Sequence, residues 1–89
     1  MDEIALKQQL KIKIIKYLNL LDISPEDIQD ETPLFGEGLG LDSIDSIELL
    51  VLLEREFGIK IENPTKARKI LSNVNEMANY IISNSKKSE

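Results

Sequence analysis

Apolar side chains recur along most of the chain at spacings of three and four residues, which is the period of amphipathic helices. The first such segment predicts a helix over residues 3–20. Its apolar stripe consists of Leu6, Leu10, Ile14, Leu18 and Leu21. A second segment begins at the Asp42-Ser43 step and predicts a helix that ends at Phe57, because Gly58 suits the left-handed conformation of a helix C-terminus.

Two further helices are predicted in the last third of the chain. Asn63 followed by Pro64 combines a capping residue with a proline at the first helical position, which predicts a short helix that ends at about residue 71. Asn73 is predicted to cap the last helix, with Glu76 three residues later in a capping-box relation. The inner face of that helix is predicted to consist of Val74, Met77, Ala78, Ile81 and Ile82.

A long loop is predicted between the first two helices. Ser24 followed by Pro25 predicts a short helical turn, and Pro33 favours an extended backbone in the residue before it. The loop residues predicted to pack onto the helices are Ile28, Leu34 and Phe35. Ile59 and Ile61 alternate with polar residues as in a strand, but the chain offers that strand no partner.

These elements predict an all-α fold, a small four-helix bundle with three longer helices, one short third helix and a long loop between helices 1 and 2. Residues 1–89 are expected to form one domain, monomeric, with a frayed polar tail over residues 83–89. The sequence contains neither an apolar run near the ~18 residues of a membrane span nor the apolar core of a signal peptide. A cytoplasmic location without membrane insertion is therefore expected.

Composition excludes several classes of function. The chain has no cysteine and no histidine, so it lacks thiol nucleophiles, thiolate metal sites, the usual general base and the commonest metal ligand. No catalytic residue and no metal site is predicted, and the protein is not expected to be an enzyme. The absence of tryptophan, the few other aromatic residues and a net charge of −5 argue against nucleic-acid binding.

Charge is unevenly distributed along the chain. Residues 22–56 contain eleven acidic residues and one basic residue, Arg55, whereas the remainder contains ten basic and five acidic residues. Such segregation creates a directional field that steers a partner of opposite charge. For residues 22–31 an alternative remains open, because a run of charges is often only a solvated loop.

The second helix carries apolar residues on more than one side. Its core face is predicted to consist of Leu49, Leu50, Leu53 and Phe57, with Ile47 at the margin. The opposite, acidic side consists of Asp45, Glu48 and Glu56, with Ile44 and Val51 at its edge and Leu52 within it. Exposed apolar groups among carboxylates indicate a docking surface. The alternative is that neighbouring helices cover these apolar side chains.

Ser43 stands at the predicted start of this helix, after three alternating glycines at Gly36, Gly38 and Gly40. Both Asp42 and Ser43 are good helix caps, and a hydroxyl at a helix N-terminus lies where the helix dipole favours a phosphate group. Taken alone, the pair is also compatible with a capped helix and nothing more.

The run from Leu41 to Leu49, LDSIDSIEL, resembles the phosphopantetheine attachment site of the acyl carrier proteins, whose core motif is Asp-Ser-Leu. Ile44 stands where leucine is usual. Residues 53–59 and 74–81 resemble the end of the family's second helix and its last helix. The longer lead-in over residues 33–41 is similar to that of carriers from specialised pathways, such as aryl polyene or polyketide-type synthesis.

The resemblance implies a covalent 4′-phosphopantetheine arm on Ser43 that carries acyl groups as thioesters. It implies that Asp42 orders the modified serine or the metal of a phosphopantetheinyl transferase, or that it is only a cap. It also implies a docking face for that transferase and for acyl-transfer and ketosynthase-type enzymes of fatty-acid or polyketide-type synthesis. The residues implied for this face are Ile44, Asp45, Glu48, Val51 and Leu52. The apolar interior of the bundle is expected to shelter part of the acyl chain.

The third helix departs from the family, because Lys66, Arg68 and Lys69 make basic a segment that is usually acidic in fatty-acid carriers. This difference indicates that the carrier works with a dedicated set of partner enzymes. Two alternatives stay open: a peptidyl or D-alanyl carrier, which would use the same serine, and an unmodified helical adaptor domain. The acidic second helix favours acyl over peptidyl cargo.

Overall fold

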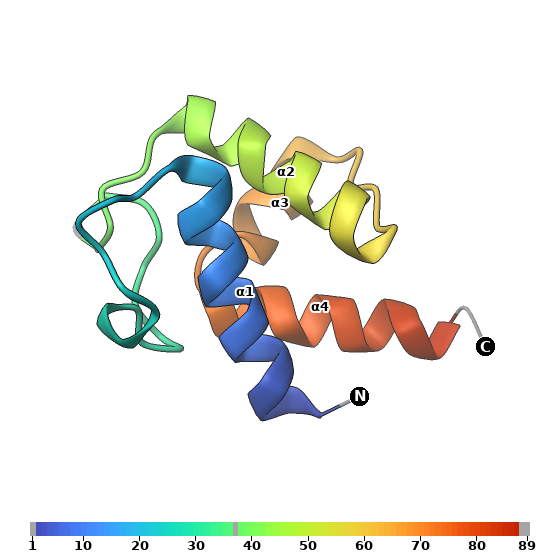
Figure 1. The fold of residues 1–89 in the computed structure, drawn as a ribbon. Coiled ribbons are helices and arrows are strands. Elements are labelled where there is room, and N and C mark those ends of the chain that lie inside the picture. The colour runs from blue at the N-terminus through green and yellow to red at the C-terminus, as the bar shows by residue number, and fades with distance from the viewer. Residues whose placement is uncertain (1, 37, 88–89) are drawn as a thin grey trace.

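The computed structural model describes residues 2–36 and 38–87, with side chains as far as Asn84. Its elements are α1 (Glu3–Leu18), the 3₁₀ turn η1 (Pro25–Asp27), α2 (Ser43–Phe57), α3 (Pro64–Ile70) and α4 (Val74–Lys87). Figure 1 shows α1 passing in front of α4 and reaching α2, with the short α3 behind them. The described residues form no strand and none of their helices is long and apolar enough to cross a membrane. The predicted all-α bundle with a long first loop is confirmed.

Helix α1 is shorter than predicted. Asp2 caps it by accepting the N–H of Ile4 at 3.0 Å. The helix ends at Leu18 because Asn19 adopts a left-handed conformation, with φ = 54°. Leu21 therefore lies beyond the helix and is 84% exposed, so its assignment to the apolar stripe is wrong. The stripe residues within the first three turns are buried, as predicted: Leu6, Leu10 and Ile14.

The buried side of α2 differs from the predicted one. Leu49, Leu52 and Leu53 are completely buried, whereas Leu50 and Phe57 are half-buried. The assignment of Leu52 to a partner surface is therefore wrong. Apolar residues occur all around this helix, so periodicity alone could not tell which of them the neighbouring helices cover.

Glu56 also lies on the side of α2 that faces the bundle, where it links α2 to α1. Its carboxylate forms an ion pair with Lys13, and the hydroxyl of Tyr17 donates to Glu56 Oε2 at 2.9 Å. The hydrogen bonds from Lys13 and Tyr17 hold the pKa of Glu56 below its ordinary value. Glu56 is exposed, as predicted, but its placement opposite the core is wrong, because side chains of α1 reach it.

The last two helices begin as predicted. Asn63 Oδ1 accepts the N–H of Thr65 at 2.9 Å at the start of α3. Asn73 Oδ1 accepts the N–H of Glu76 at 2.8 Å at the start of α4. The predicted inner face of α4 is buried at Val74, Met77, Ala78 and Ile81 and half-buried at Ile82.

The predicted frayed tail is wrong for most of its length, since α4 continues to Lys87. Residues 88–89 of that tail lie outside the described residues.

The long loop packs onto the helices through both side chains and backbone. Ile28 and Leu34 are completely buried, as predicted, and Phe35 is half-buried. The N–H of Leu34 donates to the carbonyl of Ser72 at 2.9 Å, which joins the loop to the turn between α3 and α4. These contacts fix the loop against the bundle before it reaches the start of α2.

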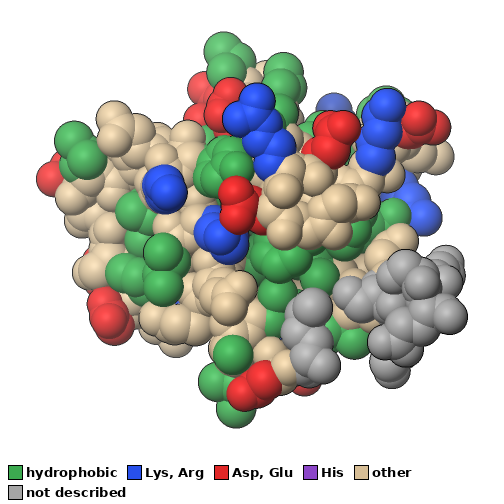
Figure 2. Space-filling view, turned by 45° about the vertical axis from the view of Figure 1, so that its right-hand side comes forward, with side chains coloured by type: hydrophobic (Ala, Val, Ile, Leu, Met, Phe, Trp, Pro, Cys, Tyr) green, Lys and Arg blue, Asp and Glu red, His purple; other side chains and the backbone are tan. Residues whose placement is uncertain are grey.

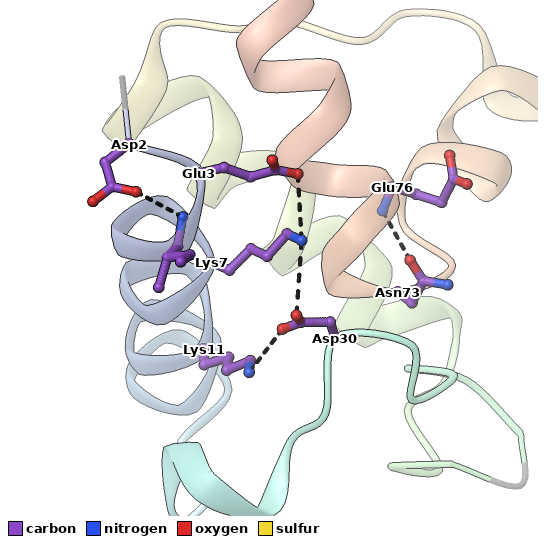
Figure 3. Close-up of polar contacts among 8 residues, drawn as sticks. Asp2, Glu3, Lys7, Lys11, Asp30, Asn73 and Glu76 are labelled. Atoms are coloured by element: carbon purple, nitrogen blue, oxygen red, sulfur yellow. Dashed lines mark hydrogen bonds and ion pairs between the residues drawn. The ribbon is translucent and has the colours of Figure 1, made fainter.

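Asp30 connects the same loop to two helices. Its carboxylate forms ion pairs with Lys11 at 2.9 Å and Lys7 at 3.7 Å, and Lys7 also contacts Glu3 at 3.3 Å (Figure 3). Its backbone carbonyl accepts the N–H of Asn75 at the start of α4 at 3.0 Å. The hydrogen bond from Lys11, together with the charge of Lys7, lowers the pKa of Asp30. Part of the acidic segment is thus paired with the basic face of α1.

Replacement of this carboxylate tests its contribution to stability. Asp30→Asn should lower the melting temperature by a few degrees at neutral pH and low salt, because an exposed ion pair contributes about 0.2–1 kcal/mol. Since the folded-state pKa is lowered, the contribution is present above the ordinary aspartate value of about 3.9 and is lost as pH falls through the lower folded value. Thermal unfolding followed by circular dichroism measures the difference.

Glu26→Gln is the matched control, because Glu26 is an exposed acid of η1 that makes no ion pair within the described part of the chain. It should leave the melting temperature nearly unchanged. A deficit of Asp30→Asn that did not shrink as pH fell below the ordinary aspartate pKa would contradict the assignment of its stabilising effect to charge.

Candidate functional site

The glycine-rich segment forms a compact loop that returns the chain to its own start. Phe35 and Leu41 form an isolated backbone bridge, and the N–H of Leu41 donates to the carbonyl of Leu34 at 3.1 Å. Gly36 and Gly40 have positive φ angles of 68° and 72°, a conformation that side chains disfavour. The loop therefore delivers Leu41, which is buried, and the next residue to a fixed position at the start of α2.

Gly38 is required for a different reason, because the backbone of Pro33 lies directly against it. A Cβ atom at this position would overlap the carbonyl oxygen of Pro33. That oxygen cannot move away freely, because it accepts the N–H of Leu39 at 3.0 Å. The glycine-rich approach to the helix is thus a tightly closed loop, although its glycines remain exposed at the surface.

A reciprocal capping box holds the start of α2. Asp42 Oδ1 accepts the N–H groups of Ile44 at 3.0 Å and Asp45 at 3.1 Å, and Asp45 Oδ2 accepts the N–H of Asp42 at 3.0 Å. Asp42 is therefore the cap, and Ser43 is the first residue of the helix. Asp45, which was expected on the docking face, is half-buried with its carboxylate turned back towards Asp42.

Ser43 has an exposed side chain whose hydroxyl makes no hydrogen bond within the described part of the chain. The hydroxyl of Ser46, one turn later, is engaged instead, because it donates to the carbonyl of Ser43 at 2.6 Å. The structure thus leaves the Ser43 hydroxyl accessible at a rigid helix start.

A cavity of about 660 Å³ lies beside Ser43, between α2, α3 and the glycine-rich loop. Its apolar lining consists of Pro33, Phe35, Leu41, Leu50, Pro64, Ala67 and Leu71. Its polar lining consists of Asp42, Ser43, Ser46, Arg68 and Ser72. The cavity therefore combines a largely apolar wall with polar groups that include the exposed hydroxyl.

The outer face of α2 is apolar as well as charged. Ile44 is 71% exposed and Ile47 is 58% exposed, with Val51 half-buried and Glu48 exposed beside them. In Figure 2, apolar side chains protrude among acidic and basic ones at the top of the molecule, at the height where α2 lies in Figure 1. Of the predicted docking residues, the structure leaves Ile44, Glu48 and Val51 accessible.

Two site residues were missed by sequence reasoning. Ile47 was placed at the core margin, and a helical wheel centred on Leu52 would have shown it on the outer face. Arg68 was noted only as part of a basic helix. Its place in the cavity wall follows from how α3 packs against α2, which no local pattern reveals.

These residues suit covalent attachment better than catalysis or metal binding. Within the described residues, no group of three or more acidic side chains could hold a metal ion. The exposed hydroxyl of Ser43 is accessible to a large partner, and the adjoining cavity has room for an apolar chain. The site therefore fits the implied phosphopantetheine group.

Comparison with known proteins bears on the same residues. Residues 17–81 match the family model described as a phosphopantetheine attachment site. The chain is 39% identical over 83 residues to the mitochondrial acyl carrier protein of Saccharomyces cerevisiae, covering 88% of this chain and 64% of that protein. It is 32% identical over 80 residues to an acyl carrier protein of Wolinella succinogenes, covering 90% and 97%. It is 36% identical over 66 residues to one of Chloroherpeton thalassium, covering 74% and 79%.

The geometry of the glycine-rich loop makes a testable distinction between two of its glycines. Gly38→Ala should lower the melting temperature more than Gly36→Ala, because the new Cβ at position 38 meets a backbone oxygen. At Gly36 a Cβ would meet open space, and only the left-handed conformation costs about 1–2 kcal/mol. Thermal unfolding by circular dichroism measures both. Equal losses for the two variants would contradict the close approach of Pro33 to Gly38.

Proposed function

The chain belongs to the acyl carrier protein family, and on that premise we propose that Ser43 is the residue to which its 4′-phosphopantetheine arm is attached. The observation that carries the proposal is the exposed hydroxyl of Ser43 at the first residue of α2, which makes no hydrogen bond to any described residue. The protein is accordingly a carrier and not an enzyme. When bound, the arm supplies a terminal thiol that holds acyl groups as thioesters.

The serines that line the cavity differ in what their hydroxyls do. Ser46 donates to the carbonyl of Ser43, and Ser72 donates to the carbonyl of Lys69 at 2.8 Å. Both are satisfied by the backbone, so their reaction would cost a hydrogen bond. The Ser43 hydroxyl has no such bond to lose among the residues that the structure describes, which favours it as the acceptor.

Ser43 needs a partner to make it nucleophilic. The chain has no histidine, so it lacks the residue that most often serves as a general base. A phosphopantetheinyl transferase would accept the hydroxyl proton, and the serine oxygen would attack the phosphate that joins the arm to the rest of coenzyme A. A phosphodiester to the arm would form as the phosphoanhydride bond breaks, and adenosine 3′,5′-bisphosphate would leave. The capping box contributes by holding Ser43 in one place, which favours reaction through orientation.

The cavity beside Ser43 is the proposed shelter for acyl cargo. Its wall from Phe35, Leu41, Leu50 and Leu71 is apolar, and it begins at the residue that would carry the arm. Burial of an acyl chain there would gain about 0.8 kcal/mol for each buried methylene group. The thioester would be shielded from water in the same place.

The outer face of α2 is the proposed docking surface for partner enzymes. Ile44, Ile47 and Val51 would supply apolar contact, and Glu48 would pair with basic groups. Rim charges steer encounter more than they hold a complex, so docking should be fast and weak. The transferase, acyl-transfer enzymes and ketosynthase-type enzymes are the expected partners.

For the pathway, only a general class of biosynthesis is proposed. We place the carrier, as a monomer, in fatty-acid or polyketide-type synthesis, and the exposed basic residues of α3 favour a dedicated set of partner enzymes. A cytoplasmic location stays a prediction, because the relatives include a mitochondrial protein.

The attachment site is tested by intact mass. After incubation with a phosphopantetheinyl transferase and coenzyme A, the wild type should gain the mass of one arm, and Ser43→Ala should gain none. Ser46→Ala is the matched control, since it removes a hydroxyl one turn away and should still be loaded. A mass gain that survived in the Ser43 variant would disprove the assignment.

The docking surface is tested by the salt dependence of loading kinetics. Glu48→Lys should slow loading several-fold at low salt, and the effect should shrink by about 0.5 M salt, where the Debye length falls to a few ångströms. Ile44→Ala removes apolar contact instead, so its penalty should be nearly independent of salt. Asp45 is unsuitable for this test, because its replacement would also break the capping box.

Glu26→Lys controls for net charge, since it makes the same change in the distant turn η1. It should load like the wild type. If Glu48→Lys, still folded by circular dichroism, also loaded like the wild type at low salt, this face of α2 would not be the docking surface.

A further inference from the structure

Of the five polar residues that line the cavity, three form side-chain hydrogen bonds within the described part of the chain and two do not. Asp42 accepts backbone N–H groups at the start of α2, and Ser46 and Ser72 donate to backbone carbonyls. Within the described part of the chain, the Ser43 hydroxyl and the Arg68 guanidinium make no hydrogen bond or ion pair. Among the described residues, an unbonded hydroxyl and an unpaired cation therefore line the same cavity.

Modification of Ser43 would add negative charge where carboxylates already lie. The capping carboxylates of Asp42 and Asp45 stand on either side of Ser43 in the sequence and close over the same helix start. Asp42 also occupies the N–H groups of Ile44 and Asp45. These N–H groups, which would otherwise bind a phosphate at a helix N-terminus, are thus already satisfied. A cation that offsets the charge of an anionic group on Ser43 would therefore come from elsewhere in the fold.

Arg68 is placed to supply that cation. It lies on the same face of α3 as Pro64, Ala67 and Leu71, all of which line the cavity opposite the α2 wall. The other basic residues of α3 do not line the cavity. Lys66 lies over the ring of Tyr80, 5.3 Å from its centre, and Lys69 is exposed outside the cavity wall.

We propose that Arg68 is a positioning residue that binds an anionic oxygen of the group carried on Ser43, either the phosphodiester itself or a carboxylate at the end of a dicarboxylic acyl chain. Both ligands present paired oxygens that match the planar, bidentate donor geometry of a guanidinium. The inference rests on the proposed attachment to Ser43 and goes beyond it, because it assigns the basic third helix a function within the carrier.

The experiment compares Arg68→Gln with Lys69→Gln, which removes the same charge one residue away and outside the cavity. Each protein is prepared unmodified, with the arm alone, with a butyryl arm and with a succinyl arm, and every modification is verified by intact mass. Butyryl and succinyl have the same number of carbons and differ in the terminal carboxylate. The readout is the melting temperature, which does not depend on the activity of any partner.

If the phosphodiester is the ligand, Arg68→Gln should lower the melting temperature by roughly 2–6 °C more in every modified form than in the unmodified protein. If the carboxylate is the ligand, the extra loss should occur only in the succinyl form. Lys69→Gln should show no extra loss in any form. An equal effect of Arg68→Gln in all four forms would overturn the proposal. Failure of the mass gain would instead overturn the attachment to Ser43, so the two failures are distinguishable.

Discussion

The position of Ser43 at the start of α2 depends on the reciprocal hydrogen bonds between Asp42 and Asp45. The carboxylate of Asp42 accepts N–H groups from the first turn of α2, and the carboxylate of Asp45 accepts the N–H of Asp42. These bonds fix the point at which the loop ends and α2 begins. Ser43 is the residue at that step. Its hydroxyl bonds to no described residue, because the neighbouring carboxylates, and not the serine, perform the capping.

The loop before α2 makes this arrangement rigid. Leu34 and Leu41 are buried on either side of the glycine-rich segment, and backbone hydrogen bonds join the loop to itself and to Ser72. Gly38 allows the two arms of the loop to approach within a distance that no side chain permits. The same packing forms one wall of the cavity, so the position of the serine and the shape of the shelter have a common structural cause.

Local sequence signals predicted much of the structure. The caps at Asn63 and Asn73, the left-handed Gly58 and the Asp42-Ser43 step all mark helix boundaries through bonds between near neighbours, and these boundaries are confirmed. The start of α2 was predicted from the same kind of signal. Hydrogen bonds between residues three or four positions apart, such as those of helix caps, can be derived from the sequence.

Apart from the early end of α1 at Asn19 and the extent of α4, the errors concern packing between distant segments. Leu52 was assigned to a partner surface and Ile47 to the core margin, because a helix that is apolar on several sides does not reveal which side its neighbours cover. The link from Glu56 to α1 was missed, because the side chains that reach it lie some forty residues away in sequence. The place of Arg68 in the cavity wall has the same origin.

The most direct test of the account is fragment-ion mass spectrometry of the wild-type protein after loading by a phosphopantetheinyl transferase. The account predicts one arm per chain, located on Ser43, with Ser46 and Ser72 unmodified. An arm located on either of those serines would contradict it, as would a folded protein that accepts none.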